Sequence, residues 1–163
     1  MHRSFSFILI SIIILSALFC ASCKENFDPG KEAEKNRNKI IQSAPIQSEY
    51  EIEKPKENLP ENIRAFSGHW VGKWNDLIPS QLIVTKISSN EITFIYSWGA
   101  NPQRGVESGV IKGTTKLDDK GRIKYDKEDL SLTFAVDTLL NKVIGVSVKG
   151  EMISNIVMEK VDN

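Results

Sequence analysis

Few side chains in this sequence could carry out catalysis or hold a metal ion. It contains two cysteines, Cys20 and Cys23, and one histidine, His69, beyond the histidine that follows the initiating methionine. A Ser–His–Asp triad would have to use His69, and the sequence has no Gly-x-Ser-x-Gly elbow for a nucleophile. A zinc site needs three or four His or Cys ligands. We therefore expect a protein that is not an enzyme and has no catalytic residue, metal site or cofactor.

Aromatic side chains are more informative, because their rings can contact a ligand or fill a core. Trp70 and Trp74 stand in one expected strand, and Tyr96 and Trp98 stand in another. Side chains alternate across a strand, so Trp70 and Trp74 share a face and lie about 13 Å apart at ~3.3 Å per residue. In an up-and-down sheet the two strands run in the same direction. Trp74 then lies near Tyr96 and Trp98 at one end, with Trp70 at the other.

A loop at residues 101–105 brings Arg104 to the same end as these rings. We predict an aromatic mouth formed by Trp74, Tyr96 and Trp98, with the Arg104 guanidinium beside it, where a small molecule could bind. The alternative is that the rings only fill the core, since an eight-stranded barrel can be packed solid with side chains. For Arg104 the alternatives are contact with an anion and a loop charge that is simply solvated.

The elements that must position these residues have the pattern of short antiparallel strands. Runs rich in Val, Ile, Thr and aromatic residues alternate with turn clusters across residues 65–163. The connections are short, so neighbouring strands pair as hairpins. The expected strands are 67–75, 80–87, 91–98, 106–115, 122–125, 129–136, 142–149 and 151–160. We predict an all-β domain, an antiparallel up-and-down eight-stranded β-barrel without exposed edges, with a two-sheet β-sandwich as the alternative.

The segment before this domain has a different composition. Residues 24–64 hold 8 basic and 9 acidic side chains among 41 residues, together with four prolines. Such a segment has too little apolar surface to offset the entropy that is lost on ordering. We predict a disordered charged tether over residues 23–64, with a short helix at 31–42. The tether would act as a spacer or, alternatively, as a segment that docks a partner.

The N-terminus has the pattern of an export signal. A basic start precedes an apolar stretch at residues 5–19, and these 15 residues are fewer than the ~20 that span a bilayer. Ala21, Ser22 and Cys23 follow, and they resemble the lipobox of bacterial lipoproteins, in which the cysteine receives the lipid. The resemblance implies a lipoprotein signal peptide at residues 1–22 and lipidation of Cys23. Ordinary cleavage near Ser22 and an uncleaved anchor remain the alternatives.

The first expected strand carries a doubled motif, Gly68-x-Trp70 and Gly72-x-Trp74. A glycine two residues before a tryptophan, at the start of an antiparallel meander, resembles the opening of calycins, the group that includes lipocalins and avidins. In calycins this tryptophan plugs the closed end of the barrel beneath a basic residue of the last strand. The resemblance implies that Gly68, Trp70 and Lys160 close the barrel here, with Lys160 where arginine is usual.

The charges balance, with 21 basic and 21 acidic side chains, which argues against nucleic-acid binding. The patterns together predict a non-enzymatic lipoprotein of the bacterial cell envelope, anchored in the outer membrane, that binds a small hydrophobic or carbohydrate-like ligand at the barrel mouth. A periplasmic or secreted location is the alternative. The alternative functions are an interaction module that binds a protein or cell-wall partner through its outer surface, and an accessory domain of a secreted hydrolase.

Overall fold

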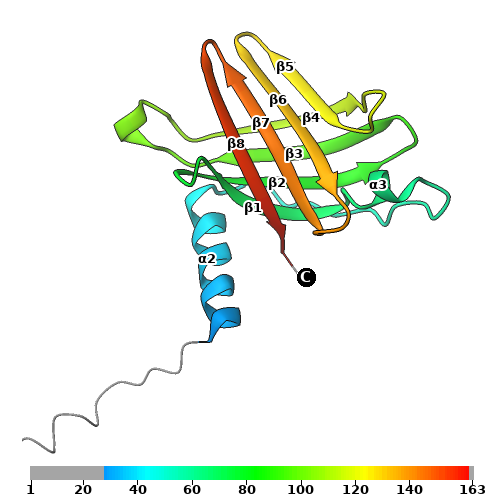
Figure 1. Cartoon of the computed structure of the whole chain (residues 1–163), viewed down its shortest axis with the longest axis horizontal. Coiled ribbons are helices and arrows are strands. Elements are labelled where there is room, and N and C mark those ends of the chain that lie inside the picture. The colour runs from blue at the N-terminus through cyan, green and yellow to red at the C-terminus, as the bar shows by residue number, and fades with distance from the viewer. Residues whose placement is uncertain (1–27, 162–163) are drawn as a thin grey trace, which may run out of the picture. The chain divides into compact units, whose positions relative to one another are not determined.

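The computed structural model describes residues 28–161 of the 163-residue chain. The expected signal peptide, residues 1–22, and the expected lipidation site, Cys23, lie outside the described residues. Eight strands in the described part form one sheet that curls into a nearly closed barrel (Figure 1). The strands are β1 (Gly68–Trp74), β2 (Ile78–Ile87), β3 (Glu91–Trp98), β4 (Gly109–Lys116), β5 (Ile123–Lys127), β6 (Leu130–Asp137), β7 (Lys142–Lys149) and β8 (Met152–Lys160).

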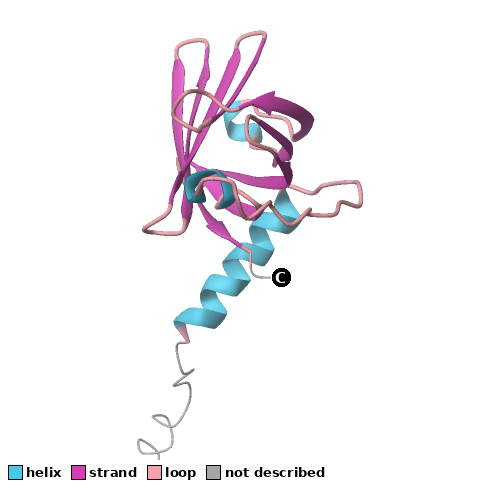
Figure 2. Cartoon of the chain, turned by 90° about the vertical axis from the view of Figure 1, so that its right-hand side faces the viewer, coloured by secondary structure: helices cyan, strands magenta, loops and turns pink. Residues whose placement is uncertain are grey.

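The strand order follows the chain, as expected for an up-and-down barrel. Consecutive strands from β1 to β4 and from β5 to β8 pair antiparallel, and β1 also pairs with β8. The order across the sheet is therefore β4-β3-β2-β1-β8-β7-β6-β5. Figure 2 shows these strands from the side. The predicted all-β barrel is confirmed, and the sandwich alternative does not apply because the β1–β8 pairing joins both groups of strands into one sheet.

The loop before β4 is the place where the predicted strand boundaries differ most. The sequence predicts a strand at 106–115, whereas β4 begins at Gly109. Val106 instead pairs back with Asn101, through hydrogen bonds of 2.8 Å and 3.0 Å between their backbone groups. The short 3-10 helix η1 (Pro102–Arg104) lies inside this pairing. The loop is thereby a small ordered unit of its own and carries Arg104.

Strands β1 and β8 join around Trp70 and Lys160. The two residues are opposite each other in the register, and Lys160 Nζ lies 5.0 Å from the centroid of the indole ring. Trp70 is fully buried, and its Nε1 donates a hydrogen bond of 2.8 Å to the Phe66 carbonyl. Gly68 has a φ of 127°, and a Cβ there would lie 2.7 Å from Lys160 Cε. Glycine therefore leaves the space that the lysine side chain occupies.

Strands β4 and β5 meet near the turn that joins them. A bridge links Leu117 to Ile123, and Thr115 Oγ1 donates a hydrogen bond of 2.8 Å to the Lys124 carbonyl. No ladder between the two strands is formed within the described residues beyond this bridge. The barrel is therefore closed along one seam by β1 and β8 and only partly along the other.

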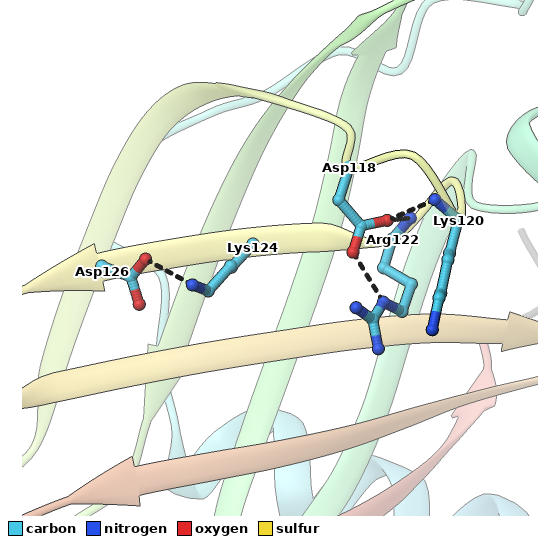
Figure 3. A network of polar contacts seen from close by, with 5 residues as sticks. All are labelled: Asp118, Lys120, Arg122, Lys124 and Asp126. Atoms are coloured by element: carbon cyan, nitrogen blue, oxygen red, sulfur yellow. Dashed lines mark hydrogen bonds and ion pairs between the residues drawn. The ribbon is translucent and has the colours of Figure 1, made fainter.

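A polar network stabilises the turn at this second seam (Figure 3). Asp118 accepts hydrogen bonds from the backbone N–H groups of Lys120 and Arg122 and, at 2.7 Å, from Arg122 Nε. Burial raises the pKa of Asp118, but these hydrogen bonds outweigh it and the pKa lies below its ordinary value. Lys124 Nζ and Asp126 form an ion pair at 3.2 Å on the outer side of β5. The network holds the turn where the two strands approach each other.

The closed end of the barrel is filled by residues that come just before β1. Leu59 and Phe66 are buried members of the same hydrophobic core as Trp70, and Ile63 packs against that core from helix α3 (Glu61–Arg64). Leu59 and Ile63 were expected in the tether, whereas Phe66 was expected in the barrel domain. All three belong to the barrel, because their apolar side chains complete the plug that Trp70 begins.

Residues 44–58, which we call the strap, lie against the outer face of the barrel. The sequence predicts a disordered tether over residues 23–64, and the structure corrects this for the strap. Ala44 is fully buried, and its carbonyl accepts hydrogen bonds from Gln81 and Ser97. Glu53 N donates to the carbonyl of Thr85 at 2.8 Å. These hydrogen bonds to β2 and β3 supply order that the charged composition does not indicate.

A helix precedes the strap. The sequence predicts a short helix at 31–42, and α2 (Pro29–Ser43) occupies this position. Asp28 starts it, since its side chain accepts hydrogen bonds from the backbone N–H groups of Gly30 and Lys31. Ile40 is buried on this helix. The N-terminal segment thus contains regular structure rather than coil.

The strap covers a buried polar cluster on the outer face of the sheet. His69 points away from the barrel interior, as the alternation predicts, but it is buried beneath the strap. Its Nε2 lies 2.7 Å from Gln81 Oε1, and its Nδ1 lies 3.4 Å from the Tyr50 hydroxyl. When Nε2–H donates to Gln81, Nδ1 accepts from Tyr50, so both ring nitrogens are satisfied in the neutral form. Burial lowers the pKa of His69, and the hydrogen bond to Gln81 opposes this only in part.

We predict that Gly68→Ala lowers the free energy of unfolding by about 1–3 kcal/mol, because alanine is strained at this φ and its Cβ displaces Lys160. Chemical denaturation measures the change. Gly113→Ala is the matched control, since a Cβ there meets only ordinary contacts at 3.9 Å or more from Phe94. Equal stability of the two variants would contradict the role of Gly68 at the seam.

We predict that the protein loses stability as the pH falls from 7 to 5. The pKa of His69 is lower in the folded chain than its ordinary value of 6.5, so the unfolded chain binds more protons below that pH. The slope for this one group is at most about 1.4 kcal/mol per pH unit. Denaturation at several pH values should show a smaller slope for His69→Gln. An unchanged slope in that variant would assign the effect to another group.

Candidate functional site

A cavity of about 590 Å³ opens at the end of the barrel opposite Trp70. The turn after β1, the loop between β3 and β4, and the hairpin between β7 and β8 surround it. The sequence analysis assigned four residues to a binding mouth, and all of them line this one cavity: Trp74, Tyr96, Trp98 and Arg104. The strand directions that follow from the hairpins explain why residues 30 positions apart meet here.

Three aromatic rings form one wall of the cavity. The Tyr96 and Trp98 rings are stacked, with centroids 5.6 Å apart and planes inclined by 27°. Trp98 extends over β4 at Gly109, where a Cβ would clash with the indole ring. Trp74 and Tyr96 are almost fully buried, whereas Trp98 is partly exposed. Glycine at 109 therefore lets Trp98 spread across the wall at the cavity opening.

The polar atoms of this wall are already used within the protein. Trp74 Nε1 donates a hydrogen bond of 2.5 Å to the Tyr96 hydroxyl, which in turn donates to Ser80 Oγ at 3.4 Å. Trp98 Nε1 donates to the Glu107 carbonyl at 2.7 Å. Burial raises the pKa of Tyr96 to about 12, although its two hydrogen bonds oppose the shift. The wall consequently offers a ligand uncharged ring faces and no free donor.

The facing wall is mainly aliphatic. It contains Leu130 and Leu132 from β6 and Met152 from β8, and beside them lie the serines Ser147 and Ser154. Phe134 lies beneath the cavity lining, with its ring centroid 5.9 Å from that of Trp74 and 5.7 Å from that of Tyr96. A Cβ at Gly145 would lie 2.7 Å from Cδ1 of the Phe134 ring, so glycine at this position leaves room for the ring. Phe134 therefore forms the bottom of the cavity and separates it from the packed core.

The rim carries the charged groups of the site. Arg104 projects from η1, Lys149 ends β7, and Glu107 follows η1 in the same loop. Sequence reasoning identified Arg104 but missed Lys149 and Glu107. The signal that could have found Lys149 was available, since in an up-and-down barrel the hairpin after β7 lies at the same end as the loop after β3. Glu107 could not be found this way, because its position depends on the fold of its own loop.

A second groove lies outside the barrel and has a different character. Its volume is about 690 Å³, and it runs between helix α2 and the outer faces of β1 and β8. Residues of both charges line it, among them Arg37, Asp76 and Glu159. Glu159 is already paired with Lys142 at 3.3 Å. Within the described chain none of the residues that line this groove is aromatic, so the cavity at the barrel mouth is the better candidate for a ligand site.

Within residues 28–161 no group of three or more His, Cys, Asp or Glu residues is placed to hold a metal ion. No helix in that part of the chain is long and apolar enough to cross a membrane. Comparison of the chain with models of protein families, with curated proteins and with solved structures finds no match.

Proposed function

We propose that this protein binds a small hydrophobic or carbohydrate-like molecule in the cavity at the barrel mouth. The observation that carries the proposal is the aromatic wall of Trp74, Tyr96 and Trp98. The barrel has a cavity beside this wall, whereas its opposite end is filled with side chains. A volume of about 590 Å³ lies within the ~300–1,000 Å³ typical of small-molecule sites. The lining is mainly apolar with a few polar groups at the rim, which is also typical of such sites.

The resemblance to calycins supports this proposal. Calycins are up-and-down barrels that enclose ligands, and the Gly68-x-Trp70 motif with Lys160 above the indole ring matches the arrangement at their closed end. The match concerns the fold and the plug, so it supports binding of a ligand without naming one. Our proposal accordingly assigns no catalytic role to any residue.

We propose further that the protein is held in the bacterial envelope, at the outer membrane, by lipid on Cys23. The support is the lipobox-like Ala21-Ser22-Cys23 after an apolar stretch. Three acyl chains on a lipoprotein cysteine exceed the two signals that stable anchoring requires. Lys24 follows the cysteine in place of the acidic residue that retains some lipoproteins in the inner membrane. A periplasmic or secreted protein is the alternative.

The second candidate function is an interaction module that binds a protein partner through its outer surface. The observation that favours it is the outer face of β7 and β8, where aliphatic side chains are between 37% and 65% exposed: Ile144, Val146, Val148, Ile153 and Val157. The alternation of side chains along β7 places Ile144, Val146 and Val148 on the outside of the barrel. Gly145 on the inner side makes room for Phe134 instead.

We predict that native mass spectrometry of the mature protein from its own host shows an additional mass that is lost on denaturation. Trp98→Ala should lose the additional mass, because it removes the exposed ring of the aromatic wall. Leu139→Ala is the control, since that side chain is 96% exposed and lies outside the cavity. A clean apo mass for the wild type would favour the interaction module.

We predict that a radioactive or clickable fatty acid labels the wild-type protein in bacterial cells and does not label Cys23→Ser. The sulfur of Cys23 is the atom that would carry the diacylglyceryl group, and the hydroxyl of serine does not take its place. The variant should also move from the membrane fraction to the soluble fraction. Persistent labelling of Cys23→Ser would show that the lipobox interpretation is wrong.

A further inference from the structure

The rim of the cavity holds charges that have no partner in the protein. Among residues 28–161, the side chains of Arg104 and Lys149 form no ion pair or hydrogen bond with another residue, and neither does the carboxylate of Glu107. By contrast, Lys142 of β7 is paired with Glu159 of β8, and Lys124 is paired with Asp126 along β5. The cavity is therefore lined by two unpaired cations and one unpaired carboxylate, a net charge of one positive unit.

We propose that the ligand of this cavity is an anionic amphiphile: its apolar body lies between the two walls, and its single anionic group binds to Arg104 and Lys149 at the rim. The inference rests on the proposed function and narrows it to one ligand class. It assigns Arg104 to contact with an anion rather than to a solvated loop charge. It also adds Lys149, which comes from the hairpin on the other side of the opening.

The hydrogen-bonding state of the lining selects an apolar body over a carbohydrate. The ring nitrogens of Trp74 and Trp98 and the hydroxyl of Tyr96 all have partners inside the protein. Asn75 is also occupied, because its Oδ1 accepts from Asn155 N at 2.9 Å and its Nδ2 donates to Ser154. The other uncharged polar side chains of the lining are three serines, Ser108, Ser147 and Ser154. A sugar carries more hydroxyl groups than these can pair, and each group buried without a partner weakens binding.

The two walls match a flat or chain-like apolar group. The aromatic wall presents Tyr96 and Trp98 ring faces on one side, and Leu130, Leu132 and Met152 present aliphatic surface on the other. Phe134 closes the inner end of the cavity. A ligand can therefore enter only from the rim, with its apolar end first and its charged end remaining at the rim. Arginine binds carboxylate, sulfonate and phosphate groups through two parallel N–H donors, and lysine adds a point charge.

The experiment uses two fluorescent probes that share one aromatic body. The probe 8-anilinonaphthalene-1-sulfonate carries a sulfonate, and N-phenyl-1-naphthylamine is its uncharged counterpart. Dissociation constants of both are measured by fluorescence titration with the wild type and with the combined variant Arg104→Gln, Lys149→Gln. We expect this variant to bind the sulfonate about ten-fold more weakly and the uncharged probe with unchanged affinity. Lys116→Gln, a cation on the outer face of β4, is the matched control.

A variant that removes a negative charge from the rim provides a second test. Glu107→Gln removes the only carboxylate that the described residues contribute to the lining, and it keeps the backbone carbonyl that accepts the hydrogen bond from Trp98. It should strengthen binding of the sulfonate probe about two-fold and leave the uncharged probe unaffected. Added salt should weaken sulfonate binding to the wild type and have little effect on the combined variant.

The outcomes separate this inference from the proposed function. Trp98→Ala should weaken the binding of both probes, because it removes part of the wall that both would contact. If this is observed, but the rim variants change the affinities for both probes equally or change neither, the assignment of an anionic ligand is overturned and the proposed binding cavity stands. If Trp98→Ala leaves both affinities unchanged, or neither probe binds the wild type, the proposed function and this inference fail together.

Discussion

The seam between β1 and β8, where Lys160 lies over Trp70, joins the first and last strands of the barrel, and the other features depend on it. Strand β1 has β2 on one edge and β8 on the other, so this seam is the main link between the two groups of four strands, which meet otherwise at the bridge near the β4–β5 turn. A cation above a buried indole contributes about 0.5–2 kcal/mol. Gly68 leaves space for the lysine, and the Phe66 carbonyl orients the indole through its N–H.

Closure at this seam leads to a barrel that is filled at one end and hollow at the other. Trp70, Leu59 and Phe66 occupy the closed end, where the chain enters the barrel. Phe134 crosses the interior above them, and Gly145 leaves the space that its ring requires. Above Phe134 the rings of Trp74, Tyr96 and Trp98 have their polar atoms paired within the protein. The interior there is therefore open to a ligand and offers it mostly apolar surface.

The outer surface is divided in a similar way. The strap covers β1, β2 and β3, and it buries outward residues such as Ile83 and Ile95 together with the His69–Gln81 pair. Within the described chain no segment covers the outer face of β7 and β8, where aliphatic residues stay exposed. One side of the barrel wall is thus an internal interface sensitive to protonation of His69, and the other is free for contact with other molecules.

Local information in the sequence determined the strands and the positions of the aromatic residues along them. Alternation and short turns depend on residues a few positions apart, so they predict the eight strands and place Trp74 at the same end as Trp98. Tertiary structure decided which groups face one another across the interior. Lys149 meets Arg104 at the rim, and Phe134 lies beneath the cavity, because strands distant in sequence curve around a common space. It also decided the order of the strap, since hydrogen bonds to the edges and faces of β2 and β3 exist only once the barrel has formed.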